Sequence, residues 1–162
     1  MQREPMLEET FNKLSAELEN LRSVERDRVA QEIDKARALG DLKENAEYHA
    51  AKEKQGHIEA RIVELSDILS RAQVVDPSKL PHKRVSFGST VVLLDYSNDE
   101  KVKYVIVGTQ ESDPAKGLIS IYSPMARAIL GKEVGDEVEL DLPSGKRLFS
   151  IEEVKFEELK VD

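Results

Sequence analysis

The chain has 162 residues, of which 35% are charged and 5% aromatic, and its net charge is −8. This high charge content fits a solvent-exposed helical part beside a small hydrophobic core better than it fits a single globular domain. Cysteine is absent, which excludes disulfides and thiolate metal sites, and the acidic balance argues against autonomous binding to duplex DNA.

The N-terminus shows no secretory signal pattern, because no basic region precedes an apolar run and a small-residue site. No apolar run approaches the roughly 20 residues that span a bilayer. We therefore expect a soluble cytoplasmic protein with no membrane partner.

A first long helix is predicted to begin near Leu7 or Glu8 and to stop at Gly40, which suits the left-handed position after a helix. Within this helix, between Leu21 and Val29, the apolar seam slips by one position. Such a slip indicates a local change in supercoiling rather than a helix end. The seam residues before the slip are Phe11, Leu14, Leu18 and Leu21, and those after it are Val29, Ile33 and Ala36.

A second helix follows almost at once, with a seam that alternates spacings of three and four. This seam comprises Tyr48, Ala51, Gln55, Ile58, Ile62, Leu65, Leu69 and Ala72. Two helices of about 30 residues joined so closely must run antiparallel, in a hairpin about 45 Å long at roughly 1.5 Å per residue.

The composition changes at two prolines, Pro77 and Pro81, so we place the coiled-coil hairpin at residues 1–75, a linker at 76–82 and a globular domain at 83–162. The second half has β-branched runs broken by turn residues, which predict a small antiparallel sheet and give the chain an α+β class. The expected strands are Arg84 to Asp95, Lys101 to Gly108, Leu118 to Tyr122, Glu137 to Leu142 and Arg147 to Val154, with a turn at 143–146.

A short helix is predicted between the third and fourth strands. Ser123 can cap it, Pro124 suits its first position and Gly131 suits its end. We expect it to pack on the sheet through Met125, Ile129 and Leu130.

The bend of the hairpin carries two acidic residues, Asp41 and Glu44, that support two interpretations. Asp41 is a good N-cap and Glu44 completes a pair resembling a capping box. The same carboxylates could instead be ligands of Mg²⁺, which often takes one or two protein carboxylates and completes its shell with water and phosphate. Two carboxylates hold the ion weakly, so this second interpretation needs another protein and an RNA phosphate.

The stretch from Asp41 to Glu53, DLKENAEYHAAKE, resembles the signature of the Gre transcript-cleavage factors. The block from Ser123 to Lys132, SPMARAILGK, with Gly135-Asp136 after it, resembles the C-terminal motif of that family. The likeness covers essentially the whole chain, and the acidic charge favours the family's A type over its more basic B type.

The resemblance implies a C-terminal domain similar in fold to FK506-binding proteins that docks on RNA polymerase, and a hairpin that enters the polymerase secondary channel. Asp41 and Glu44 would share the second Mg²⁺ of a backtracked complex, and the polymerase would cleave the 3′ end of its own RNA. The chain itself would be a monomeric accessory factor rather than an enzyme, with no tightly bound cofactor. The resemblance also assigns RNA contacts to Arg37, Lys43 and Lys52, and polymerase docking to Ser123, Pro124 and Met125.

Each of these assignments has a plainer alternative. The basic residues, with Lys54, could be a solvated face that pairs with acids such as Glu47, and Tyr48 is more consistent with packing than with base stacking. His49, His57 and His82 lack the spacing of a helical zinc pair. For the whole chain, the alternatives are an inhibitor that occupies the channel without promoting cleavage, a chaperone or prolyl isomerase, and a nucleotide-pool regulator.

Overall fold

The computed structural model describes residues 2–159, which form two compact units. One unit is Phe11–Ala72, and the other joins Gln2–Thr10 to the chain from Gln73 onward. Residues 2–10, expected in the hairpin, thus group with the second unit. Among the described residues, no helix is both long enough and apolar enough to cross a membrane.

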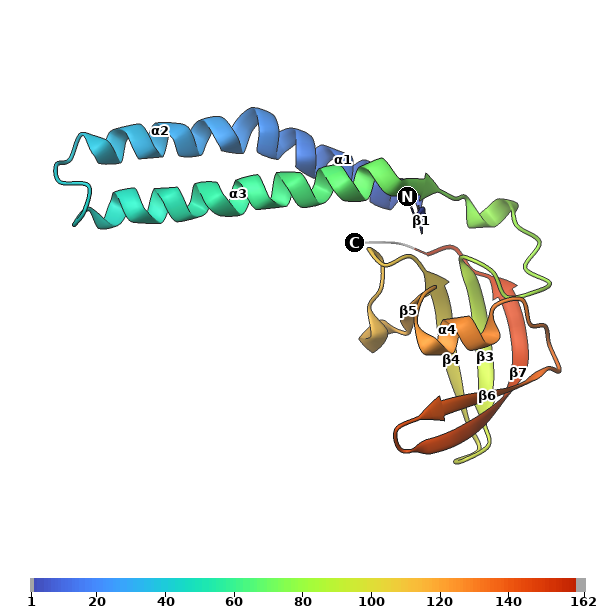
Figure 1. The fold of residues 1–162 in the computed structure, drawn as a ribbon. Helices are drawn as coiled ribbons and strands as arrows, with labels where there is room; N and C mark the ends of the chain where they lie inside the picture. Colours follow the sequence, from blue (N-terminus) through green and yellow to red (C-terminus); the bar gives the residue numbers. More distant parts are fainter. Residues whose placement is uncertain (1, 160–162) are drawn as a thin grey trace. The chain divides into compact units, whose positions relative to one another are not determined.

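The first arm of the hairpin is helical from Glu8 to Arg37, but it has a defect in the middle. It consists of α1 (Glu8–Asn20), the π-helical turn η1 (Leu21–Glu25) and α2 (Arg26–Arg37). Figure 1 labels α1 and α2 along this arm. The Arg26 N–H donates to the Leu21 carbonyl, five residues back. A π-helical turn accommodates one extra residue, so it explains the one-position slip of the seam: Leu14 and Leu18 are buried before it, and Val29, Ile33 and Ala36 after it.

The second arm is a single helix, α3 (Ala46–Arg71), which runs beside α2 (Figure 1). Its seam follows the predicted spacing, except that Ile68 is buried where Leu69 was expected. Paired charges link the two arms: Arg61 donates to both carboxylate oxygens of Glu17, and Arg26 does the same to Glu59. The buried residues of α3 are Ala51, Ile58, Ile62, Leu65 and Ile68.

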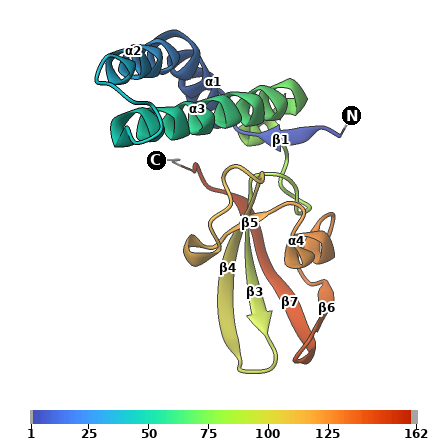
Figure 2. The ribbon, with the colours of Figure 1, turned by 60° about the vertical axis from the view of Figure 1, so that its left-hand side comes forward.

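The second unit is built on a five-stranded sheet in the order β5-β4-β3-β7-β6 (Figure 2). All five predicted strands are present, although the first begins at Ser89 rather than Arg84. The sheet is not wholly antiparallel as predicted, because β5 pairs with β4 in parallel. The strands are β3 (Ser89–Asp95), β4 (Glu100–Val107), β5 (Leu118–Ser120), β6 (Glu137–Leu142) and β7 (Gly145–Phe156).

The core of this unit lies between the sheet and α4 (Pro124–Ile129), the predicted short helix. Ala126 and Ile129 of α4 are fully buried, while Met125 is partly buried against the same core. The sheet contributes mainly branched apolar side chains, namely Val91, Leu93, Ile106, Ile119, Val138, Phe149 and Ile151.

Two short strands, β1 (Glu4–Met6) and β2 (Ala72–Val74), pair with each other and were not predicted. The expected linker is folded as well: it contains the 3₁₀ turn η2 (Pro77–Lys79), and a second such turn, η3 (Pro114–Lys116), precedes β5. His82 is buried, and its ring contacts the Pro77 carbonyl and the Ser89 hydroxyl.

Candidate functional site at the hairpin tip

The hairpin bends through an eight-residue loop, 38–45, between Arg37 and Ala46. Gly40 has a φ of +126°, a conformation that favours glycine. The second helix begins at Ala46, later than a cap at Asp41 would require. The predicted capping role of Asp41 and Glu44 is therefore wrong, and both residues belong to the loop.

Asn45 is the residue that caps α3. Its side-chain oxygen accepts a hydrogen bond from the Tyr48 N–H at 3.0 Å. Its side-chain nitrogen donates to the Ala36 carbonyl at 2.6 Å, in the last turn of α2. One amide side chain thus binds an N–H at the start of one helix and a carbonyl in the last turn of the other, which also accepts from the Leu39 N–H.

Asp41 and Glu44 are exposed and line one open hollow of about 410 Å³ with Leu39, Asn45 and Glu47. One oxygen of Asp41 accepts from the Lys43 N–H at 3.0 Å, which leaves its second oxygen available. Hard oxygen donors of this kind fit Mg²⁺. The described residues contain no cluster of three or more acidic or histidine groups that could hold a metal. Asp41 and Glu44 are thus two exposed carboxylates that line the same hollow.

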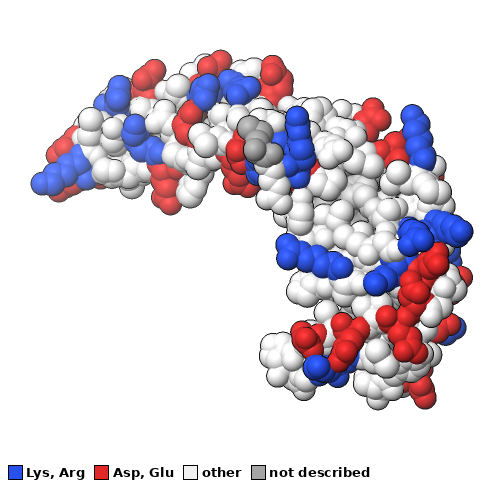
Figure 3. All heavy atoms as spheres, turned by 45° about the vertical axis from the view of Figure 1, so that its right-hand side comes forward, with Lys and Arg blue, Asp and Glu red and all other residues white. Residues whose placement is uncertain are grey.

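The basic residues near the tip differ in their surroundings. Arg37 and Lys43 are exposed, with no ion pair among the described residues, whereas the Lys52 ammonium donates to the Gln55 side chain at 3.1 Å. Lys54 pairs with Glu32 of the other arm at 3.2 Å, and not with Glu47. Along the hairpin, acidic and basic side chains alternate without a broad basic stripe on the face that Figure 3 shows.

His49 has a local role that the sequence did not indicate. Its Nε2 lies 3.0 Å from the Lys43 carbonyl, inside the loop. A carbonyl only accepts, so Nε2 must carry the hydrogen and donate it. His49 and Asn45 were missed because their partners lie across the bend, where spacing along one helix carries no signal.

The predicted docking residues begin α4 in the second unit. The Ser123 hydroxyl donates to the Ser120 carbonyl at 2.7 Å and accepts from the Ala126 N–H, so it caps the helix as expected. Pro124 is exposed and Met125 is half-buried. Met125 also lines a cavity of about 430 Å³, together with Tyr104, Phe149, Leu140 and Arg147 among others.

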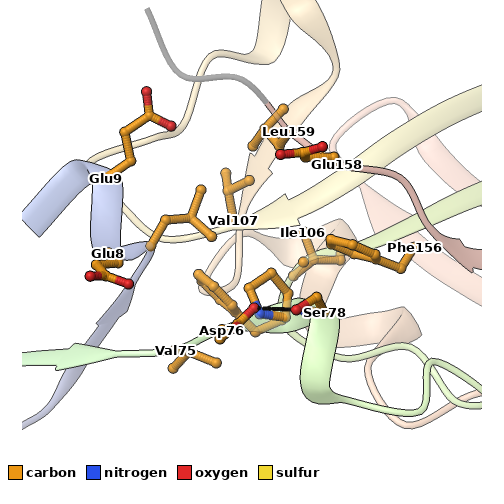
Figure 4. Close-up of a pocket in the computed structure, with 14 residues that line it drawn as sticks. Glu8, Glu9, Val75, Asp76, Ser78, Ile106, Val107, Phe156, Glu158 and Leu159 are labelled. Carbon is orange, nitrogen blue, oxygen red and sulfur yellow. Dashed lines mark hydrogen bonds between the residues drawn. The ribbon is translucent and has the colours of Figure 1, made fainter.

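Another cavity, of about 410 Å³, lies within the second unit (Figure 4). Phe87 and Phe156 contribute to it, but the rest of its lining is mainly aliphatic, with carboxylates such as Glu8 and Glu158. Phe87 is only 6% exposed and belongs to the interior. A prolyl isomerase needs an aromatic-lined pocket, and the mainly aliphatic and acidic lining of this cavity does not favour that interpretation.

Comparison with known proteins identifies the family. Residues 4–74 match the family described as Transcription elongation factor, N-terminal, and residues 80–156 match Transcription elongation factor, GreA/GreB, C-term. The chain is similar to three proteins named Transcription elongation factor GreA. That of Sulfurovum sp. (strain NBC37-1) is 69% identical over 159 residues, 98% of each chain. That of Nautilia profundicola is 61% identical over the same shares, and that of Helicobacter pylori (strain 26695) is 55% identical over 100% of this chain and 99% of the relative. These matches confirm the resemblance, and the chain belongs to the GreA/GreB family of transcription elongation factors.

Proposed function

We propose that this chain binds RNA polymerase and stimulates the polymerase to cleave the 3′ end of backtracked RNA. Family membership supports the role in elongation. The observation that carries the cleavage step is the tip itself: Asp41 and Glu44 are exposed in one hollow, at the end of a long hairpin, with too few ligands to retain a metal. Two carboxylates bind Mg²⁺ weakly by themselves, so the remaining ligands would come from a second molecule.

The proposed division of labour follows from the donors on each side. Mg²⁺, when shared with the polymerase, lowers the pKa of a bound water and so supplies the nucleophile. Asp41 and Glu44 would hold that ion, while Arg37, Lys43 and Lys52 would contact the RNA segment. These three residues are exposed, which leaves their charges accessible to phosphates.

The second unit would supply the docking contact through Ser123, Pro124 and Met125. The cap that Ser123 makes fixes the backbone, so that Pro124 and part of Met125 face outward on a rigid helix end. We place this action in the cytoplasm, with a monomeric factor bound to one polymerase.

Asp41→Asn and Glu44→Gln test the proposal in a stalled, backtracked elongation complex with labelled RNA. Asn can still accept from the Lys43 N–H, so Asp41→Asn removes a charge while keeping the turn. Removing a direct ligand should slow cleavage by more than about 100-fold, since even outer-shell partners of a metal cost about 10–100-fold.

Competition binding to polymerase should remain at the wild-type level for both variants. Wild-type cleavage by the two variants would contradict the proposal. Wild-type protein that occupies the polymerase but protects the RNA from shortening would favour the inhibitor instead.

A further inference from the structure

Two side chains, those of Asn45 and His49, form hydrogen bonds that fix the tip loop. Neither has a role in the function proposed above. Asn45 joins the start of α3 to the Ala36 carbonyl of α2, and His49 holds the Lys43 carbonyl from one turn further along α3. The Lys43 N–H is bound by Asp41. The backbone of Lys43 is therefore held at both its N–H and its carbonyl, by an acidic residue of the loop and by a histidine of the helix.

From this geometry we propose that Asn45 and His49 are positioning residues, which fix the loop so that the carboxylates of Asp41 and Glu44 face one ion together. The inference rests on the proposed function and names the parts that make its site rigid. Glu44 precedes Asn45 in the chain, so the two bonds of the Asn45 amide set where the Glu44 backbone lies. Asp41 is linked to His49 through the backbone of Lys43, whose N–H bonds Asp41 and whose carbonyl bonds His49.

Rigidity matters at this site because the carboxylates are exposed. Fixing one residue of a free loop costs about 1–2 kcal/mol of conformational entropy. A loop that is ordered before it meets the polymerase does not incur that cost on binding. Reacting groups must also be held near their productive geometry for catalysis to proceed.

An ordinary N-cap needs only a hydrogen-bond acceptor. The donor group of Asn45 therefore indicates a second role, which is its bond to the Ala36 carbonyl. Asp, Ser and Asn cap helices about equally well. Only Asn has a side-chain N–H₂ group that can reach back to the Ala36 carbonyl while its oxygen receives the Tyr48 N–H. Asn45→Ser therefore separates the two tasks: it keeps a neutral cap and loses the bond across the bend.

His49 offers a matched pair of substitutions. His49→Ala removes the donor to the Lys43 carbonyl, whereas His49→Gln supplies an amide N–H that can replace it. Glu53→Gln serves as the control, because Glu53 is exposed on the same helix and its carboxylate lies 3.6 Å from the His57 ring, away from the loop.

The experiment measures cleavage of backtracked RNA at saturating full-length factor, as a function of Mg²⁺ concentration. Asn45→Ser and His49→Ala should lower the rate at limiting Mg²⁺ by about tenfold or more and raise the half-maximal Mg²⁺ concentration, as loss of outer-shell support does. His49→Gln should recover most of the rate, and Glu53→Gln should match the wild type. Helix content should stay unchanged in all four variants, and the saturating concentration of factor keeps any loss of polymerase affinity out of the measured rate.

Asp41→Asn, run in parallel, separates the two possible failures. If it abolishes cleavage while Asn45→Ser and His49→Ala show wild-type rates and Mg²⁺ dependence, the positioning inference is wrong and the proposed function stands. If Asp41→Asn also cleaves normally, both are wrong. A rate that falls only with helix content, with no change in Mg²⁺ dependence, would reduce Asn45 to a plain cap and overturn the inference.

Discussion

Within the second unit, Gly108 has no side chain, and this lets the N-terminal segment pack closely against its backbone. A Cβ there would lie 2.2 Å from the Pro5 carbonyl oxygen and 2.8 Å from the Glu111 carboxylate. That buried carboxylate accepts from the Gly108 N–H at 2.8 Å and from the Leu7 N–H at 2.9 Å. Gly108 thus allows the backbone of Pro5 to approach and lets Glu111 bind the backbone at both Leu7 and Gly108.

Gly108→Ala should displace this segment, because the clash is with backbone. We expect the free energy of unfolding to fall by about 1–3 kcal/mol, as for other overpacked sites. Urea unfolding measures the loss, and hydrogen exchange should show that the Leu7 amide loses protection.

Gly56→Ala is the matched control for that change. A Cβ at Gly56 would meet nothing within 4 Å, and the residue lies inside α3, where Ala favours the helix by about 0.5–1 kcal/mol. This variant should be slightly more stable than the wild type. Equal destabilisation by the two alanines would show that the close approach at Gly108 is unimportant.

At the same scale, the sequence predicted which acidic residues lie at the bend but misassigned the cap. Asp41 with Glu44 three residues later has a capping-box pattern, and local pattern alone cannot reject it. Asn45 prevails because its amide also bonds Ala36, nine residues earlier, a contact that exists only once both helices have formed. The positions of Asp41 and Glu44 could be predicted, whereas their anchors could not.

Among the elements, the π-helical turn η1 determines how α1 and α2 share one seam. It holds one residue more than an α-helix would need between Leu18 and Val29. Deleting Arg22, which is exposed, should let the arm continue as an ordinary α-helix with both halves of the seam still buried. We expect thermal unfolding, followed by circular dichroism at 222 nm, to change little.

Deleting Gln31 is the corresponding control. It is also exposed, but it lies beyond the π-helical turn and would rotate Ile33 and Ala36 off the seam by about 100°. The hairpin should then lose substantial stability, because two buried side chains leave their positions. If both deletions destabilise equally, η1 does not absorb the slip.

The other helices and strands could be predicted where their sequence patterns extend over enough residues to be recognised. β3 and β4 carry β-branched runs, β6 alternates apolar with acidic residues, and β7 follows the predicted turn at 143–146. The Ser-Pro and Gly signals marked α4 correctly. β1 and β2 have three residues each, too few for an alternation to be seen, and pair across more than 60 residues. The parallel pairing of β5 with β4 depends on the path of the chain through η3, which no local pattern encodes.

At the scale of the whole molecule, both units contain carboxylates whose pKa is lowered by hydrogen bonds and by neighbouring arginines. Bonds from Arg61 hold the pKa of Glu17 below its ordinary value, and Arg26 does the same to Glu59. In the sheet, bonds from Ser97 and then the charge of Arg147 lower the pKa of Asp95. Groups shifted in this direction stabilise the fold above their unfolded pKa and lose that contribution as the pH falls through the folded pKa.

Glu17→Gln tests this account in the hairpin. At pH 7 the partly exposed pair contributes less than about 1 kcal/mol, so the variant should lose little stability there. The wild type should lose stability more steeply than the variant between about pH 5 and pH 3, because only the wild type must protonate a carboxylate whose folded pKa is depressed. Thermal unfolding at a series of pH values measures the two slopes.

Glu19→Gln makes the same charge change on α1 at an exposed residue with no ion pair among those described, and its slope should follow the wild type. A Glu17→Gln slope as steep as that of Glu19→Gln would mean that the Arg61 pair does not govern the acid response of the hairpin.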